Sequence, residues 1–212
     1  MTLSTVLALH DGTALAAALR YTLAQTHDAR LEAVRTVIDH ACSELEVNSH
    51  LKKDLSEDQL TIEICQYMRG LGFEPRHDEQ AGGHCDILVR GKNMFMWVAE
   101  AKWHTSYSWL DQGFQQLATR YSTGVPGQDQ GEVIIYCRNR DALAMLSKWR
   151  EELSNRNAAV ETADDESGNP LAFWSTHKHE KTGLDYRVRH KVVTLHHEPA
   201  DKNKAACDSR DE

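Results

Sequence analysis

The sequence predicts an α/β protein with a central mixed sheet, a helical N-terminal extension and a C-terminal β-hairpin. Residues 12–48 and 56–72 carry apolar side chains at helical spacing. Between residues 84 and 137, three apolar runs with strand character surround another helical stretch. Residues 171–197 contain two more strand-like runs around a Lys-Thr-Gly turn. A chain of 212 residues is long enough for one sizeable α/β domain with additions.

The first part of the chain is predicted to be helical. Residues 12–48 divide into two helices at a break near Thr26–Asp28. Ser56 begins the next helix, and Gln59 completes a capping box with it. The apolar stripe of this helix consists of Leu60, Ile64, Tyr67, Met68 and Leu71. Gly72 marks the end of the helix.

Strands are predicted in the middle of the chain. A short strand in residues 72–80 leads to a turn at Gly82–Gly83, and residues 84–91 form the next strand. The chain turns back at Gly91–Asn93. Residues 94–103 then carry bulky apolar side chains in succession, which is typical of a central strand covered on both faces.

The second half of the chain alternates helices and strands. Residues 108–124 are expected to be helical, residues 131–137 to form a buried strand and residues 141–153 to form another helix. Residues 161–170 form an acidic loop, and residues 171–197 form the final hairpin. The predicted domain limits are a helical extension over 1–50, an α/β domain over 51–199 and a disordered polar tail over 200–212.

Cysteine usage and the N-terminus indicate a cytoplasmic protein. The five cysteines are scattered and show no metal-knuckle spacing, so we expect reduced, mostly buried thiols. The first apolar run is cut short by His10 and Asp11, and therefore fits neither a secretory signal nor a membrane span.

The distribution of charge permits a nucleic-acid partner despite a net charge of −8. Residues 81–150 hold eight bases and six acids, and residues 171–200 hold five bases and three acids, so each stretch has a net charge of +2. These mildly basic stretches carry the candidate chemistry, and a phosphate backbone is compatible with them.

Three charged residues stand out in the stretch "GGHCDILVRGKNMFMWVAEAKWH". Glu100 and Lys102 project from the same face of one strand, and Asp86 lies on the strand paired with it. Two carboxylates at short range form an oxygen site that suits Mg²⁺ or Mn²⁺. A lysine beside that metal orients a water and, with a lowered pKa, helps to deprotonate it. The three residues therefore indicate hydrolysis of a phosphodiester.

The alternative for these residues is a surface salt bridge between Glu100 and Lys102 on an exposed strand face. The neighbouring sequence of Trp97, Val98 and Ala99 disfavours it, because a central strand rarely tolerates charges that have no function.

Asp86 and the run Glu100-Ala101-Lys102, with a preceding acid-bearing helix and a following glutamine-rich helix and strand, resemble the PD-(D/E)XK nuclease superfamily. The likeness is greatest to restriction-endonuclease-like proteins of the Mrr and RecB type, and it covers roughly residues 56–140. Cys85 stands where the family name has proline. The resemblance implies a restriction-endonuclease-like αβββαβ core and a metal-dependent nuclease that acts most often on DNA.

Further site residues follow from this resemblance. Family members often use an acid of the first helix to complete the metal site, and we prefer Glu57 to Glu63 because Glu57 lies on the apolar face. A helix N-terminal acid stabilised by the dipole is the alternative role for Glu57. The run "QQLATRY" resembles the glutamine-to-tyrosine motif of the RecB type, which implies that Gln116 supports the site. A plain polar helix face is the alternative there.

Candidate nucleic-acid contacts lie outside the three central residues. His84 either touches the scissile phosphate or hydrogen-bonds the turn, and we favour the turn. Trp103 follows the lysine directly and is a candidate for substrate contact. Arg187 and Arg189 lie on the hairpin of residues 176–190. This hairpin is either a phosphate-contacting or partner-binding ribbon or a solvated edge hairpin, and we prefer the solvated edge.

Two classes of function remain open on the sequence alone. One is a Mg²⁺- or Mn²⁺-dependent DNA endonuclease in defence against foreign DNA. The other is a catalytically silent, nuclease-like binding or scaffolding module in a larger assembly. The complete set of Asp86, Glu100 and Lys102 favours the enzyme. The N-terminal helices are the candidate surface for a homodimer or a defence-system partner, and the sequence leaves DNA and RNA undistinguished as substrates.

Overall fold

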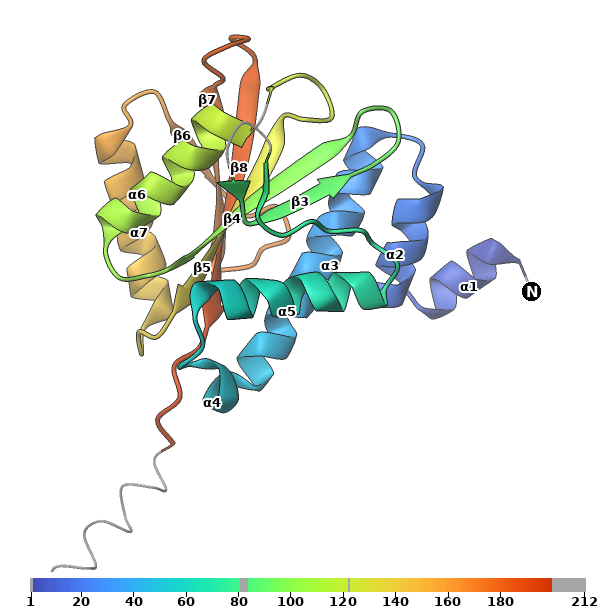
Figure 1. Cartoon of the computed structure of the whole chain (residues 1–212), viewed down its shortest axis with the longest axis horizontal. Coiled ribbons are helices and arrows are strands. Elements are labelled where there is room, and N and C mark those ends of the chain that lie inside the picture. The colour runs from blue at the N-terminus through green and yellow to red at the C-terminus, as the bar shows by residue number, and fades with distance from the viewer. Residues whose placement is uncertain (1, 81–83, 122, 200–212) are drawn as a thin grey trace, which may run out of the picture.

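A six-stranded mixed sheet with helices on both faces organises the described part of the chain (Figure 1). The structure, a computed structural model, describes residues 2–80, 84–121 and 123–199. The predicted α/β class with a mixed sheet is confirmed. The predicted turn at Gly82–Gly83 and the tail predicted over 200–212 lie outside the described residues.

The strands of the sheet run in the order β3, β4, β5, β8, β7, β6. Their bounds are β3 Ile87–Arg90, β4 Met96–Trp103, β5 Gln130–Cys137, β6 Glu161–Asp164, β7 Ala172–Lys178 and β8 Asp185–Thr194. β4, β5 and β8 are parallel, and the other pairs are antiparallel. β4 is therefore an inner strand, as predicted, and each of its residues is buried.

Two expectations for the C-terminal part are wrong. Residues 161–164 of the predicted acidic loop form β6, which is the edge strand beside β7. The hairpin of β7 and β8 is confirmed, but it is not a solvated edge, because β8 pairs with β5 inside the sheet. A sheet that buries this hairpin on both sides leaves its inward-facing charges without access to water.

The helices of the first face precede the sheet in the chain. They are α1 Leu3–Leu9, α2 Ala14–Leu23, α3 His27–Val47, α4 Ser49–Lys52 and α5 Glu57–Gly70. The helix break near residue 26 and the capping box of Ser56 and Gln59 are both confirmed. α3 and α5 pack on the face of β4 that carries Trp97, Ala99 and Ala101.

α3 shares the core of the sheet. Val34, Val37 and Ile38 of α3 have no exposed surface. The carboxylate of Asp39 in α3 binds Arg189 of β8 at 2.9 Å, which ties the helix to the middle of the sheet. α2, α3 and the sheet thus have a common hydrophobic core.

The other face of the sheet is covered by α6 Tyr107–Gln116, a π-helical turn over Leu117–Tyr121, and α7 Ala142–Arg156. Their buried side chains, including Phe114 and Trp149, meet Val98 and Val133 of the sheet. No helix in the described residues is long and apolar enough to cross a membrane. The four described cysteines, Cys42, Cys65, Cys85 and Cys137, are buried.

Candidate active site

Asp86, Glu100 and Lys102 come together in the structure. The Nζ of Lys102 lies 2.7 Å from Oε1 of Glu100 and 4.0 Å from Oδ2 of Asp86. Glu100 and Lys102 project from the same face of β4, as strand alternation predicts, and are only 2% and 6% exposed. Asp86 stands between β2 His84–Cys85 and β3. The salt bridge between Glu100 and Lys102 is therefore buried and not on a surface.

Asp86 is held by the backbone of β4. β3 pairs with β4 only as far as Ala99, which lies opposite Ile87. Beyond that point the backbone N–H of Ala101 donates a 2.7 Å hydrogen bond to Oδ2 of Asp86. A buried backbone N–H needs an acceptor. Because the pairing with β3 ends before Ala101, the Asp86 side chain accepts this hydrogen bond in place of a β3 carbonyl.

Glu57 joins the same strand end. As the first residue of α5, it accepts a 2.8 Å hydrogen bond at Oε2 from the backbone N–H of Trp103. Its Oε1 lies 3.5 Å from the Nζ of Lys102. Glu63, the alternative, instead pairs with Lys52 at 2.7 Å. The structure thus brings Glu57 to the lysine and Glu63 to a different partner.

Burial and nearby charges shift the pKa values of Glu100, Asp86 and Lys102. Burial raises the pKa of Glu100 to about 7, and the nearby charge of Asp86 acts in the same direction. Burial also raises the pKa of Asp86, against the lowering effect of the Ala101 N–H. Burial lowers the pKa of Lys102, but Glu100, Asp86 and Glu57 outweigh it and the net pKa is raised. The predicted lowering of the Lys102 pKa is therefore wrong.

α6 lies directly against the buried pair. A Cβ at Gly113 would come within 2.9 Å of Cγ of Lys102 and 3.5 Å of Cγ of Glu100. Gln116 is half-buried three residues further along, on the neighbouring part of the same helix surface. Trp109, one turn before Gly113, places its ring 5.2 Å from the Nζ of Lys102. The sequence did not mark Trp109 as a site residue, because the contact of α6 with Lys102 appears only in the structure.

His84 belongs to a small two-stranded sheet beside the site, formed by β1 Glu79–Gln80 and β2. Its ring Nδ1 lies 2.9 Å from Oδ1 of Asp78. Its carbonyl oxygen accepts a 2.5 Å hydrogen bond from the hydroxyl of Tyr121. These contacts agree with the preferred role for His84, that of supporting the turn before Asp86.

Trp103 points away from the lysine. Its ring is 9% exposed and packs in the core on the α5 side of the sheet. The indole N–H donates to the carbonyl of Leu55 at 3.2 Å, and the guanidinium of Arg138 lies 3.7 Å from the ring centroid. The contacts of Trp103 are therefore with the protein, and they leave little of its ring for a substrate.

Arg189 cannot reach a phosphate in this structure. It is 2% exposed, and its guanidinium binds Asp165 and Asp39 at 2.9 Å each. Arg187 lies on the same strand face but nearer the surface, where it pairs with Glu166 at 2.6 Å. The physical reason for the difference is the inner position of β8, which buries the middle of the predicted ribbon. Of the two arginines, Arg187 alone keeps a partly exposed side chain.

The donor chemistry of the site fits a hard divalent cation. The Asp86 and Glu100 oxygens lie within 4.0 Å of one nitrogen, closer together than the roughly 8 Å that would prevent them from sharing an ion. The Oε2 atom of Glu100 is buried and, within the described residues, lacks a hydrogen-bond partner. Across those residues no three His, Cys, Asp or Glu side chains form a ready ligand set. A cation held by Asp86 and by Oε2 of Glu100 would lie beside the Lys102 ammonium, which contacts Oε1 of Glu100.

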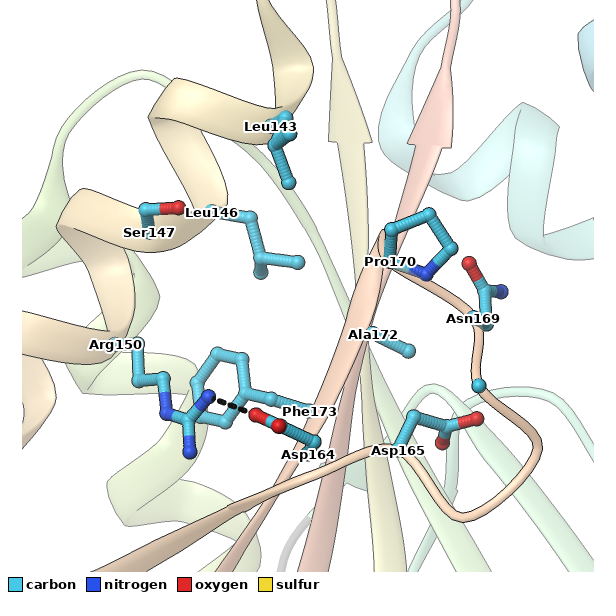
Figure 2. A pocket seen from close by; sticks show the side chains of 11 residues that line it. Leu143, Leu146, Ser147, Arg150, Asp164, Asp165, Asn169, Pro170, Ala172 and Phe173 are labelled. Atoms are coloured by element: carbon cyan, nitrogen blue, oxygen red, sulfur yellow. Dashed lines mark hydrogen bonds and ion pairs between the residues drawn. The ribbon is translucent and has the colours of Figure 1, made fainter.

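A separate cavity of about 360 Å³ lies between α7 and residues 164–173 (Figure 2). It is lined by Leu146 and Phe173 and by an ion pair of Arg150 and Asp164 at 2.6 Å. The lining residues come from other elements than the acid–lysine cluster, and the charges at its rim are already paired.

Comparisons of the chain with protein-family models, with curated proteins and with solved structures gave no significant match.

Proposed function

We propose that this protein is a metal-dependent nuclease with a restriction-endonuclease-like core, and that it hydrolyses phosphodiester bonds in DNA. The observation that carries the proposal is the convergence of Glu57, Asp86 and Glu100 on Lys102 at one end of β4. The succession of α5, the β3–β4 hairpin, α6 and β5 is compatible with the αβββαβ order that the resemblance implies. Burying this many charges costs free energy of folding. A catalytic role would explain why the protein keeps them.

Asp86 and Glu100 would hold Mg²⁺ or Mn²⁺ through their oxygens. When bound, such an ion polarises a phosphate oxygen and promotes ionisation of water. The protein positions these two ligands. The backbone N–H of Ala101 holds Asp86, and the close packing of α6 at Gly113 restricts the Glu100 side chain. The orphaned Oε2 of Glu100 is the atom best placed to gain a partner.

Lys102 acts as a hydrogen-bond donor and a positive charge in this proposal. Its pKa is raised by Glu100, Asp86 and Glu57, which favours the protonated ammonium at neutral pH. A protonated lysine can orient the attacking water and stabilise negative charge that develops on the phosphate. Glu57, which bonds both Lys102 and the Trp103 backbone, positions the lysine at the strand end.

The proposed partners are DNA and a second protein surface. Mildly basic composition around the site is compatible with a phosphate backbone. The helices α1 and α2 expose Leu9, Leu15 and Leu23 by 70%, 50% and 43%. Exposed apolar side chains of this kind support the proposal that the N-terminal helices contact another copy of the chain or a partner in defence against foreign DNA.

A second candidate function is a catalytically silent binding or scaffolding module. The observation that favours it is the 2.7 Å contact of Lys102 with Oε1 of Glu100, which already gives this buried carboxylate a positively charged partner. Incubation with plasmid, linear duplex and RNA, in Mg²⁺, Mn²⁺ or EDTA, separates the two. Metal-dependent cleavage supports the enzyme, and binding without cleavage in every condition supports the scaffold.

A further inference from the structure

Trp109 differs from the other tryptophans of the chain. It is 38% exposed, whereas the exposed fraction of the other four is at most 9%. The buried ones are Trp97, Trp103, Trp149 and Trp174. Leu110 and Phe114 pack the inner side of α6 against the core and are fully or almost fully buried. An exposed indole is thus not needed to anchor this helix.

The position of Trp109 beside the site is fixed by its helix. Ser106 caps α6, and its Oγ accepts a 3.2 Å hydrogen bond from the backbone N–H of Trp109. One turn later, Gly113 lets the helix pack closely against the Lys102 side chain. The ring of Trp109 lies 5.2 Å from the Nζ of Lys102, close enough for a cation–π contact. The indole therefore lies at the rim of the acid–lysine cluster, with part of its surface open to solvent.

We propose that Trp109 is a stacking platform for an unpaired base beside the scissile phosphate. This inference rests on the function proposed above and names its substrate class: single-stranded or locally unpaired nucleic acid. Aromatic side chains bind bases of any sequence through their π-faces. The bases of an intact duplex are covered on both faces by their neighbours, and opening one costs a few kcal/mol. A platform 5.2 Å from the lysine thus favours substrates whose bases are already free.

The test measures binding apart from cleavage. Wild type, Trp109→Leu and Trp109→Phe are titrated in EDTA against a fluorescein-labelled oligothymidylate and a blunt hairpin duplex, with anisotropy as the readout. Leucine keeps an apolar cover over Lys102 but cannot stack, and phenylalanine keeps the stack. We expect Trp109→Leu to bind the oligothymidylate roughly 5- to 100-fold more weakly. Trp109→Phe should retain most of the affinity, and duplex binding should be the same for all three.

The matched control is Leu143→Ala, which truncates a side chain that is 52% exposed on α7. It should bind both probes as wild type does. Quenching of tryptophan emission by unlabelled oligothymidylate should occur in wild type and be largely lost in Trp109→Phe. Thermal unfolding checks that each variant is folded.

Several outcomes separate this inference from the proposed function. If wild type cleaves DNA but Trp109→Leu binds the oligothymidylate as tightly as wild type, the stacking platform is wrong and the nuclease stands. Cleavage of blunt duplex as fast as of single strands would also overturn the platform. If wild type binds with quenching but never cleaves, the platform stands and the nuclease fails. If it neither binds nor cleaves, both are wrong.

Discussion

The carboxylate of Asp86 accepts a 2.7 Å hydrogen bond from the backbone N–H of Ala101, where β4 extends beyond its partner β3. Two residues later, Glu57 accepts the N–H of Trp103 at 2.8 Å. Two carboxylates, from different segments of the chain, thus accept the backbone N–H groups of β4 that have no partner in β3. The end of β4 is the point at which the short strand β3, the start of α5 and the buried lysine meet.

Removing Asp86 should abolish tight cation binding. Asp86→Ala deletes one of the two proposed ligands, so we expect Mn²⁺ affinity to fall by about tenfold or more. Isothermal calorimetry of the folded variant measures this. Glu63→Ala is the control, because that acid lies on α5 but pairs with Lys52. Equal Mn²⁺ binding by wild type and Asp86→Ala would exclude the assignment.

The raised pKa of Glu100 predicts a stability that depends on pH. In the unfolded chain this carboxyl titrates near its ordinary 4.5, and in the folded protein near 7. Between these values the folded state holds a proton that the unfolded state has released, so stability falls as pH rises through that window. The loss contributed by Glu100 is on the order of 2–3 kcal/mol.

Glu100→Gln cannot ionise and should remove this contribution. Urea unfolding in EDTA at about pH 5 and about pH 8 measures the free energy of unfolding of both proteins. We expect the difference between the two pH values to be smaller in Glu100→Gln. An identical pH dependence in the two proteins would mean that Glu100 is not the titrating group.

The buried arginine of β8 should matter for stability. Arg189→Met leaves Asp39, Asp165 and Glu132 without their guanidinium partner, and breaking such a buried set typically costs about 3–5 kcal/mol. Arg187→Met is the matched control on the same strand face. Its pairing with Glu166 is partly exposed, and exposed pairs contribute at most about 1 kcal/mol. Equal urea midpoints for the two variants would contradict the buried network.

Much of the fold was predictable from local patterns. The capping box of Ser56 and Gln59 fixed the start of α5, and the apolar run before Trp103 identified an inner strand. Alternation along that strand placed Glu100 and Lys102 together, because side chains two residues apart share a face. These features depend on neighbours in the sequence, which is why sequence analysis found them.

The errors concern interactions between distant segments. β6 has an acidic, exposed sequence, and it is a strand because β7 provides a pairing edge. Arg189 has the polarity of a surface residue, but α3, β5 and the segment after β6 bring carboxylates to it. The pKa of Lys102 is raised because Glu57 and Asp86 add to the effect of Glu100. None of these contacts is visible in local spacing.

A substitution at Gly113 tests the close packing of α6 against Lys102 and Glu100. Alanine has the better helix propensity by about 1 kcal/mol, but its Cβ would press on Cγ of Lys102 at 2.9 Å. We expect Gly113→Ala to lower kcat roughly tenfold to a hundredfold and to cost about 1–3 kcal/mol of stability, because the buried Lys102 stem must shift. Gly70→Ala is the control, because a Cβ there would meet nothing within 4 Å. Full activity of Gly113→Ala would show that α6 does not determine the position of the Lys102 side chain.

The most direct test of the proposed nuclease activity compares wild type with Lys102→Ala in cleavage and gel-shift assays on the same DNA, with Mg²⁺ and with EDTA. Lys102 acts on the water and the developing charge, so its loss should slow cleavage on the order of 10²–10⁴-fold. DNA affinity should change little, because several contacts share it. Metal-dependent cleavage by wild type that disappears in Lys102→Ala is the predicted result. Equal cleavage by the two proteins would contradict the account.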